Sequence, residues 1–203
     1  MPPLWKQIQR IGVENFPYWL DDDDVCYYAR DYVSEGGYGA SEANQLISNF
    51  KKPPERRGRP EWHYKEQAIA QFAREIASID NLEEFLVTCI PCSTSRQDPA
   101  YDPRLDDTLR VLKNLRPNVA VEFLLSFQEN MTPAHHGGIR NPDIIYANLA
   151  WSRTRSTLTN IVVVDDVLTS GAHFKACKRM IIENITNAHV VGLFWARTVR
   201  PDR

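Results

Sequence analysis

The sequence has no apolar run long enough to span a bilayer, and its first residues, MPPLWKQIQRIG, lack the apolar core of a signal peptide. It also has little net charge, because 24 basic and 26 acidic side chains leave a formal charge of -2 at pH 7. This balance does not point to a nucleic-acid or membrane partner. We therefore expect a cytoplasmic protein, and its 203 residues fit one domain or one domain with a small appendage.

Cysteine is scarce as well, since the chain has only four. Cys89 and Cys92 have the spacing of a metal or redox pair, and His135 and His136 could in principle complete a zinc site. However, there is no second pair of cysteines, and Cys89 lies in an apolar run. Packed or loop thiols in a reducing compartment are the simpler interpretation.

The most informative stretch is NIVVVDDVLTSGAHFKACKRMI, residues 160–181. Its β-branched run at 161–164 predicts a buried central strand that ends at Asp165 and Asp166. A tight turn follows at 168–171, where Gly171 permits unusual backbone dihedrals. The apolar spacing after the turn predicts an amphipathic helix.

This arrangement suits a phosphosugar. Thr169, Ser170 and Gly171 lie next to a helix N-terminus, where free N–H groups and the macrodipole favour an anion. Asp165 and Asp166 would accept hydrogen bonds from vicinal sugar hydroxyls, while the turn holds a 5′-phosphate. The alternative is an ordinary buried strand that ends in a solvated acid pair, as in other α/β folds.

The same stretch resembles the phosphoribosyl pyrophosphate (PRPP) signature of type I phosphoribosyltransferases: a hydrophobic run, two acids, two variable residues, then Thr-Ser/Thr-Gly. The resemblance covers residues 162–172 and departs at His173, where many members carry a threonine that holds the 5′-phosphate. A histidine can still donate a hydrogen bond there. The resemblance implies that PRPP contacts Asp165, Asp166, Val167, Leu168, Thr169, Ser170, Gly171, Ala172 and His173.

A second loop fits the same ligand. Residues 85–91 predict a strand, and in the family the loop after the first core strand binds pyrophosphate. The corresponding residues here are Ser93, Thr94, Ser95 and Arg96. Their hydroxyls, backbone amides and guanidinium suit that task.

Residues 119–127 predict a further strand, and residues 128–148 then show little apolar periodicity. A loop of that length in a compact domain is usually functional or disordered. Its position corresponds to the catalytic loop that closes over the substrate in the family. Arg140, His135 and His136 are then candidates to neutralise the departing pyrophosphate, Arg140 foremost because its charge does not depend on pH. Alternatively, they are exposed loop polar residues.

The remaining elements complete an α/β pattern. A helix is expected at 61–78, another after Asp102-Pro103, and a last strand at 189–196. Strands that alternate with helices predict a parallel sheet flanked by helices, with ligands beyond the carboxyl ends of the strands. The order of parts over residues 61–198 is closest to the competence-associated phosphoribosyltransferase-like proteins.

We divide the chain into residues 1–59, an aromatic-rich accessory or hood region, and residues 60–203, a phosphoribosyltransferase-like core. In the first part, Ser41 is expected to cap a short helix, and the acidic run 21–24 favours a solvated turn or helix start over a cation site. The basic stretch KKPPERRGRP, residues 51–60, is expected to be a solvated joint, although its cations could also touch a phosphate or nucleic acid.

The resemblance implies an enzyme that binds PRPP with Mg²⁺, which PRPP itself would mainly hold. It would transfer phosphoribose to a nitrogen nucleophile, a nucleobase or amine, and release pyrophosphate, with Asp165, Asp166 and Arg140 as the catalytic residues. A non-catalytic PRPP- or nucleotide-binding regulatory module of the same fold is the alternative. A nucleic-acid-associated accessory protein ranks third, since only the basic stretch and the aromatics suggest it. A homodimer is plausible from the resemblance alone.

Overall fold

The central sheet of this protein is mostly parallel. The computed structural model describes residues 8–12, 17–131 and 141–200. In them, the strand order is β1-β2-β9-β8-β4-β5, and β3 also pairs with β9. Only β1 runs antiparallel to its neighbour in this sheet, and β6 and β7 form a separate antiparallel pair. The strands are β1 Gln9–Arg10, β2 Val25–Tyr28, β3 Asp31–Val33, β4 Leu86–Cys89, β5 Ala120–Val121, β6 Leu125–Phe127, β7 Leu149–Trp151, β8 Asn160–Leu168 and β9 His189–Val199.

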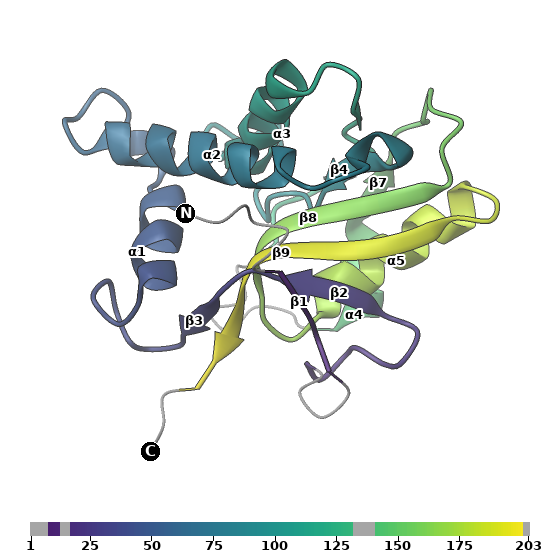
Figure 1. Cartoon of the computed structure of the whole chain (residues 1–203), viewed down its shortest axis with the longest axis horizontal. Helices are drawn as coiled ribbons and strands as arrows, with labels where there is room; N and C mark the ends of the chain where they lie inside the picture. The colour runs from purple at the N-terminus through teal and green to yellow at the C-terminus, as the bar shows by residue number, and fades with distance from the viewer. Residues whose placement is uncertain (1–7, 13–16, 132–140, 201–203) are drawn as a thin grey trace.

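Helices cover both faces of the sheet, as Figure 1 shows. The helices are α1 Glu42–Phe50, α2 Trp62–Ala77, α3 Arg104–Leu115, α4 Pro142–Asn148 and α5 Ala172–Asn184, with short 3₁₀ turns η3 Pro54–Arg56 and η4 Leu82–Glu84. One apolar cluster joins the sheet to α1, α2 and α3, and the other joins it to α4 and α5. The mixed α/β architecture with a parallel sheet between helices is therefore confirmed. Among the described residues, no helix is both long and apolar enough to cross a membrane.

The alternating directions of the side chains along β8 explain why this strand contributes to both apolar clusters. Ile161 and Val163 belong to the cluster on the α5 side, whereas Val162 and Val164 belong to the cluster on the α2 side. Successive strand residues point to opposite faces, so a fully β-branched run can fill both cores at once. The expected helix at 61–78 is confirmed by α2, and Ser41 caps α1 by accepting a hydrogen bond from the Asn44 N–H at 3.0 Å.

The expected single strand at 119–127 is wrong. The chain forms two short strands instead, and they lie in different sheets: β5 pairs with β4, and β6 pairs with β7. Between them the Leu124 N–H donates to Thr88 Oγ1 at 3.4 Å, and the Glu122 carboxylate accepts from the Arg155 N–H at 3.2 Å. These contacts turn the chain away from the edge of the sheet, which a continuous apolar run cannot reveal.

The segment 128–148 also differs from the expected loop, because residues 142–148 form α4. Asn141 caps this helix, accepting a hydrogen bond from the Asp143 N–H at 2.8 Å, and Pro142 occupies the first helical position. An N-cap residue followed by proline is a helix-start signal. We expected a loop because the segment has little apolar periodicity, and that weighed more than the signal.

Residues from the expected accessory region take part in the central sheet. β2 and β3 both pair in parallel with β9. The acidic run forms the expected turn, but Asp24 is buried and not solvated, with its carboxylate 2.6 Å from Lys175 Nζ and 2.7 Å from Lys178 Nζ on α5. The N-terminal part of the chain is thus fastened to the same helix that follows the acid pair.

Candidate functional site

The acid pair lies inside β8 and not after it. We expected the strand to end at Asp165 and Asp166, but β8 continues through Leu168, where it still pairs with Arg197 of β9. Asp166 is buried, whereas Asp165 is partly exposed. The alternative of a solvated acid pair therefore does not describe Asp166, and the strand continues past the acids because the long β9 strand offers pairing partners there.

Two cations hold Asp166. Arg104, in the first turn of α3, donates through Nε to Asp166 Oδ2 at 3.1 Å, and its Nη2 lies 3.0 Å from the same oxygen. Lys51, just after α1, places Nζ 3.0 Å from Asp166 Oδ1. Both carboxylate oxygens of Asp166 are therefore already paired.

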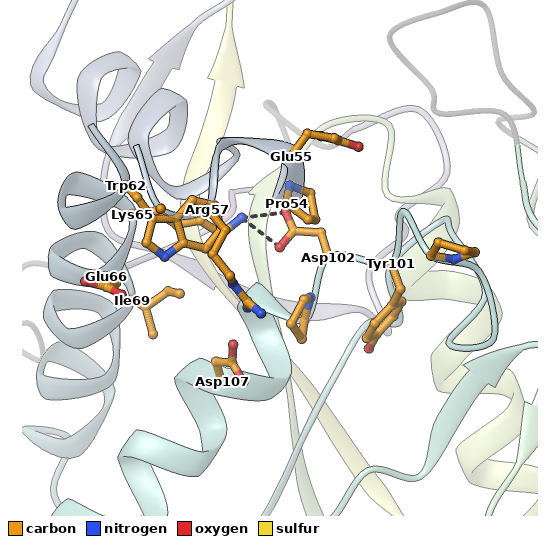
Figure 2. A pocket seen from close by; sticks show the side chains of 13 residues that line it. Pro54, Glu55, Arg57, Trp62, Lys65, Glu66, Ile69, Tyr101, Asp102 and Asp107 are labelled. Atoms are coloured by element: carbon orange, nitrogen blue, oxygen red, sulfur yellow. Dashed lines mark hydrogen bonds and ion pairs between the residues drawn. The ribbon is translucent and has the colours of Figure 1, made fainter. Parts of the chain in front are cut away.

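The charged network extends away from the sheet through Asp102. Arg104 Nη1 lies 2.9 Å from Asp102 Oδ2, and Lys65 Nζ on α2 lies 2.7 Å from Asp102 Oδ1. Lys65 is only 2% exposed. Figure 2 shows the pair between Lys65 and Asp102 at the wall of a pocket. A buried charge of this kind persists only with a partner, so each cation fixes the acid beside it.

The two acids have opposite pKa shifts. Burial, together with the negative charge of Asp166, raises the pKa of Asp165 to about 7. Burial also acts to raise the pKa of Asp166, but Lys51 and Arg104 outweigh it and hold that pKa below its usual value. The Asp166 N–H donates to Asp165 Oδ1 at 2.7 Å, and among the described residues no donor reaches Asp165 Oδ2. Asp165 is thus the acid with an oxygen left for a ligand.

The turn after the strand has the backbone that its sequence predicts. Gly171 has φ of +80°, in the left-handed region, and it is the N-cap of α5. The first N–H groups of a helix have no partner within it, so the N-terminus of α5 presents donors at this turn that its own helix does not satisfy. Thr169 is exposed, and Ser170, whose carbonyl accepts from the Trp19 N–H at 3.0 Å, is partly exposed.

The other residues of the predicted PRPP stretch are more enclosed. Val167 and Leu168 are buried in opposite cores, and Ala172 is buried at the start of α5. His173 is half-buried, and its ring meets that of Phe127 edge-on at 6.3 Å between centroids. Burial lowers the pKa of His173, against the opposing charge of Asp166, so its imidazole is neutral at pH 7 and retains one N–H donor.

The loop after β4 reaches the same edge of the sheet. Cys89, the last residue of β4, pairs with Val164 in parallel register, so the chain leaves β4 next to the acid pair and continues into residues 93–96. The Ser93 carbonyl accepts from the Met131 N–H at 2.7 Å, and the Ser95 N–H donates to Asn130 Oδ1 at 2.7 Å. Thr94 lies between them, partly exposed. The Ser95 hydroxyl accepts a long hydrogen bond from the Gln97 N–H at 3.5 Å and can still donate one to a ligand.

Arg96 is already engaged within the protein. Its Nη2 lies 3.0 Å from Asp106 Oδ2, and its guanidinium lies over the Phe123 ring at 5.4 Å. We expected this side chain to bind pyrophosphate, and the structure directs it toward α3.

Several expectations fall outside the described residues, namely those for Arg140, His135 and His136. Cys89 is buried beside Asp106, with Sγ 3.7 Å from Oδ1, and burial raises its pKa, whereas Cys92 is partly exposed. Within the described part of the chain, no cluster of three or more His, Cys, Asp or Glu side chains could hold a metal ion.

Two hollows lie beside the charged network. The larger, about 800 Å³, lies between η3, α2 and the start of α3, with Trp62, Tyr101 and Asp102 among its lining residues (Figure 2). The smaller, about 420 Å³, contains Lys51 in its wall. Residues 53–58 contribute to both hollows.

Sequence reasoning missed the cations of the site. Arg104 follows Asp102-Pro103, which we took only as a helix start, and Lys51 belongs to the stretch expected to be a solvated joint. The signal for Lys51 was the charge of that stretch. No signal in the sequence could pair Arg104 with Asp166, because 62 residues separate them.

No protein-family model matches this chain, and no curated protein matches it either.

Proposed function

We propose that this protein binds PRPP and transfers its phosphoribosyl group to a nitrogen nucleophile, with release of pyrophosphate. One observation carries the proposal: in the last four residues of a central parallel strand stands an acid, Asp165, with an oxygen that no donor among the described residues reaches, and after the strand come a left-handed glycine and the N-terminus of α5. The fold that we propose for the chain is accordingly a type I phosphoribosyltransferase core.

In this proposal, different residues bind different parts of PRPP. Ionised Asp165 accepts hydrogen bonds from the ribose hydroxyls. Asp166, which is paired with Lys51 and Arg104, sets the electrostatic field beside it. The N–H groups of α5, the hydroxyls of Thr169 and Ser170, and the His173 N–H bind the 5′-phosphate. The hydroxyls of Ser93, Thr94 and Ser95 bind the pyrophosphate, and Arg140 remains a proposed contact to it.

The site offers Mg²⁺ one carboxylate ligand. Mg²⁺ is commonly held by one or two carboxylates together with substrate phosphates, and Asp165 Oδ2 offers one carboxylate oxygen. When bound, the ion would neutralise charge on the pyrophosphate oxygens. The other ligands would come from PRPP and water.

The chemical step requires little proton transfer before bond cleavage. The nitrogen lone pair attacks the anomeric carbon as the bond from that carbon to pyrophosphate breaks, and the bonding pair leaves with the pyrophosphate. The nitrogen of the new C–N bond then loses its extra proton to solvent. The protein accelerates this step by positioning the ribose and by neutralising the leaving group.

The test is calorimetric titration of PRPP, with and without Mg²⁺, into the wild type, Asp165→Asn and Asp80→Asn. Asp80 is an exposed acid at the opposite end of the sheet and serves as the matched control. We expect Asp165→Asn to weaken binding at least tenfold and Asp80→Asn to leave it unchanged. A folded wild type that does not bind PRPP would refute the proposal.

A second candidate is a regulatory module that binds PRPP or a nucleotide without turnover. Its support is that both oxygens of Asp166 and the guanidinium of Arg96 are already paired within the protein. Measuring pyrophosphate release with a panel of nucleobases and amines separates the candidates. Release above the rate without acceptor supports the transferase, and saturable binding without release supports the module.

A further inference from the structure

The smaller hollow beside the acid pair is basic. It is lined by Ser48, Lys51, Lys52, Pro53, Arg56 and Glu61, and its volume is about 420 Å³. Three cations and one acid therefore line a space large enough for a small ligand. Such a surface favours an anion with more than one negative charge.

Lys51 joins this hollow to the acid pair. Its Nζ lies 3.0 Å from Asp166 Oδ1, yet the side chain is 41% exposed. The ammonium carries three donors, and this contact occupies one of them. A ligand seated at Asp165 would thus extend toward a cation that can bind it without leaving Asp166.

The other two cations have only weak partners. Lys52 Nζ bonds to the side-chain oxygen of Asn49 and lies 5.5 Å from the centroid of the Tyr64 ring. Arg56 pairs with Glu61 at 3.3 Å, and both side chains are substantially exposed. Exposed ion pairs contribute little free energy, so a multiply charged anion can replace these contacts at small cost.

One of the two cations expected to hold pyrophosphate is engaged elsewhere, because Arg96 is paired with Asp106. We infer that Lys51, Lys52 and Arg56 form the subsite for the diphosphate group of the phosphosugar ligand, an inference that rests on the proposed function. The cations would neutralise the charge that develops on the departing pyrophosphate. The basic stretch is then part of the binding site and not only a joint.

The experiment measures binding of inorganic pyrophosphate and, separately, ribose 5-phosphate by calorimetry. The variants are Lys52→Gln and Arg56→Gln, which leave the Lys51–Asp166 contact intact. Arg59→Gln is the matched control, because Arg59 is an exposed cation of the same stretch that does not line the hollow. Circular dichroism and thermal unfolding establish that each variant is folded.

We expect each of the two hollow variants to weaken pyrophosphate binding roughly tenfold, the loss of one charge-assisted hydrogen bond, with less than about a twofold change for Arg59→Gln. Ribose 5-phosphate should bind equally well to all of them. Equal losses in all three variants would overturn the inference, since they would indicate only the general field of the basic stretch.

The two proposals can fail separately. If ribose 5-phosphate and PRPP bind but the hollow variants behave as wild type, the subsite is wrong and the proposed function stands. If pyrophosphate binds through Lys52 and Arg56 but neither sugar phosphate binds, the subsite stands and the proposed function falls. If the protein does not bind pyrophosphate but binds an oligonucleotide in a salt-dependent way, the subsite is wrong and the basic stretch binds nucleic acid instead.

Discussion

At the scale of single residues, Asp165 and Asp166 do different work although they are neighbours of the same type. Asp166 is compensated by Arg104 and Lys51, whereas Asp165 keeps an oxygen without a donor among the described residues. Asp165 therefore holds its proton up to a pH of about 7, since its pKa is raised to about that value. A carboxyl with a raised pKa and an oxygen without a donor contributes little to the stability of the folded protein, but it is well suited to bind a ligand.

Replacing Asp165 by asparagine should stabilise the protein in a pH-dependent way. Unfolded chains ionise this carboxyl near pH 4, but the folded chain keeps the proton until about pH 7, so the free energy of unfolding falls as pH rises between these values. Asp165→Asn removes that loss. Urea unfolding at pH 4 to 8 should show an advantage for the variant that grows to roughly 2–4 kcal/mol at pH 8. A difference that does not change with pH would contradict this account.

Replacing Arg104 by methionine should be costly, because Asp102 and Asp166 would both lose their shared partner inside the protein. We expect the free energy of unfolding at pH 7 to fall by about 3 kcal/mol or more. Arg110→Met is the control on the same helix, since its side chain is 55% exposed and pairs with Asp107. That variant should lose less than about 1 kcal/mol. Similar losses in both would mean that the buried network contributes no more than a surface pair.

The identity of the acids was predictable and their surroundings were not. The order of hydrophobic run, acids, turn and helix is local, so the sequence displays it directly. The partners of Asp166 come from two distant elements, α3 and the end of α1, and only the folded chain brings them together. Sequence reasoning therefore did not anticipate that Asp166 is buried between two cations.

At the scale of elements, the turn between β8 and α5 is closed by the N-terminal segment. A side chain added at Gly171 would approach the end of the Leu20 side chain at 2.7 Å, and the backbone there has φ of +80°. Sequence reasoning anticipated the need for glycine from the turn itself. It did not anticipate Leu20, because the two residues are far apart in the chain.

The two demands on Gly171 can be separated by a double-mutant cycle. Gly171→Ala should cost about 3 kcal/mol of unfolding free energy, from backbone strain and the approach to Leu20. In a Leu20→Ala background the clash is relieved, and the same substitution should cost only about 1–2 kcal/mol. Chemical denaturation of the four proteins provides the measurement. Strict additivity would mean that Leu20 does not contact this turn closely.

Elements with strong local signals were predicted best. α2 and β4 lie within about two residues of their expected bounds, and the apolar stripe of α5 is buried. The region 119–148 was predicted worst. Its apolar run is divided between two sheets, and its short helix depends on a cap more than on periodicity.

At the scale of the whole molecule, the N-terminal region is built into both cores. Phe50 of α1 lies 5.4 Å from Trp195 of β9, measured between ring centroids, and Cys26 and Tyr28 belong to the cluster on the opposite face. The sequence suggested an accessory element because its aromatic composition differs from that of the rest. Composition, however, does not report which strands pair.

A fragment of residues 60–203 should therefore not fold stably by itself. Without β2, β3 and α1, one edge of β9 loses its pairing and the face of Trp195 that meets Phe50 becomes exposed. We expect the fragment to lose its near-ultraviolet circular dichroism and to bind a hydrophobic dye. A cooperative thermal transition of the fragment, comparable with that of the whole chain, would support a domain boundary near residue 59.

The pairing of β2 with β9 also determines when the protein can finish folding on the ribosome. Val25 pairs with Val191, so β2 must wait until synthesis has reached β9 before this neighbour exists. Contacts of such long range close slowly, and until then the edges of β2 and β8 stay open to other chains. Synthesis should thus be the stage at which this protein most needs a chaperone, because β9, which lies between β2 and β8 in the sheet, is made after both of them.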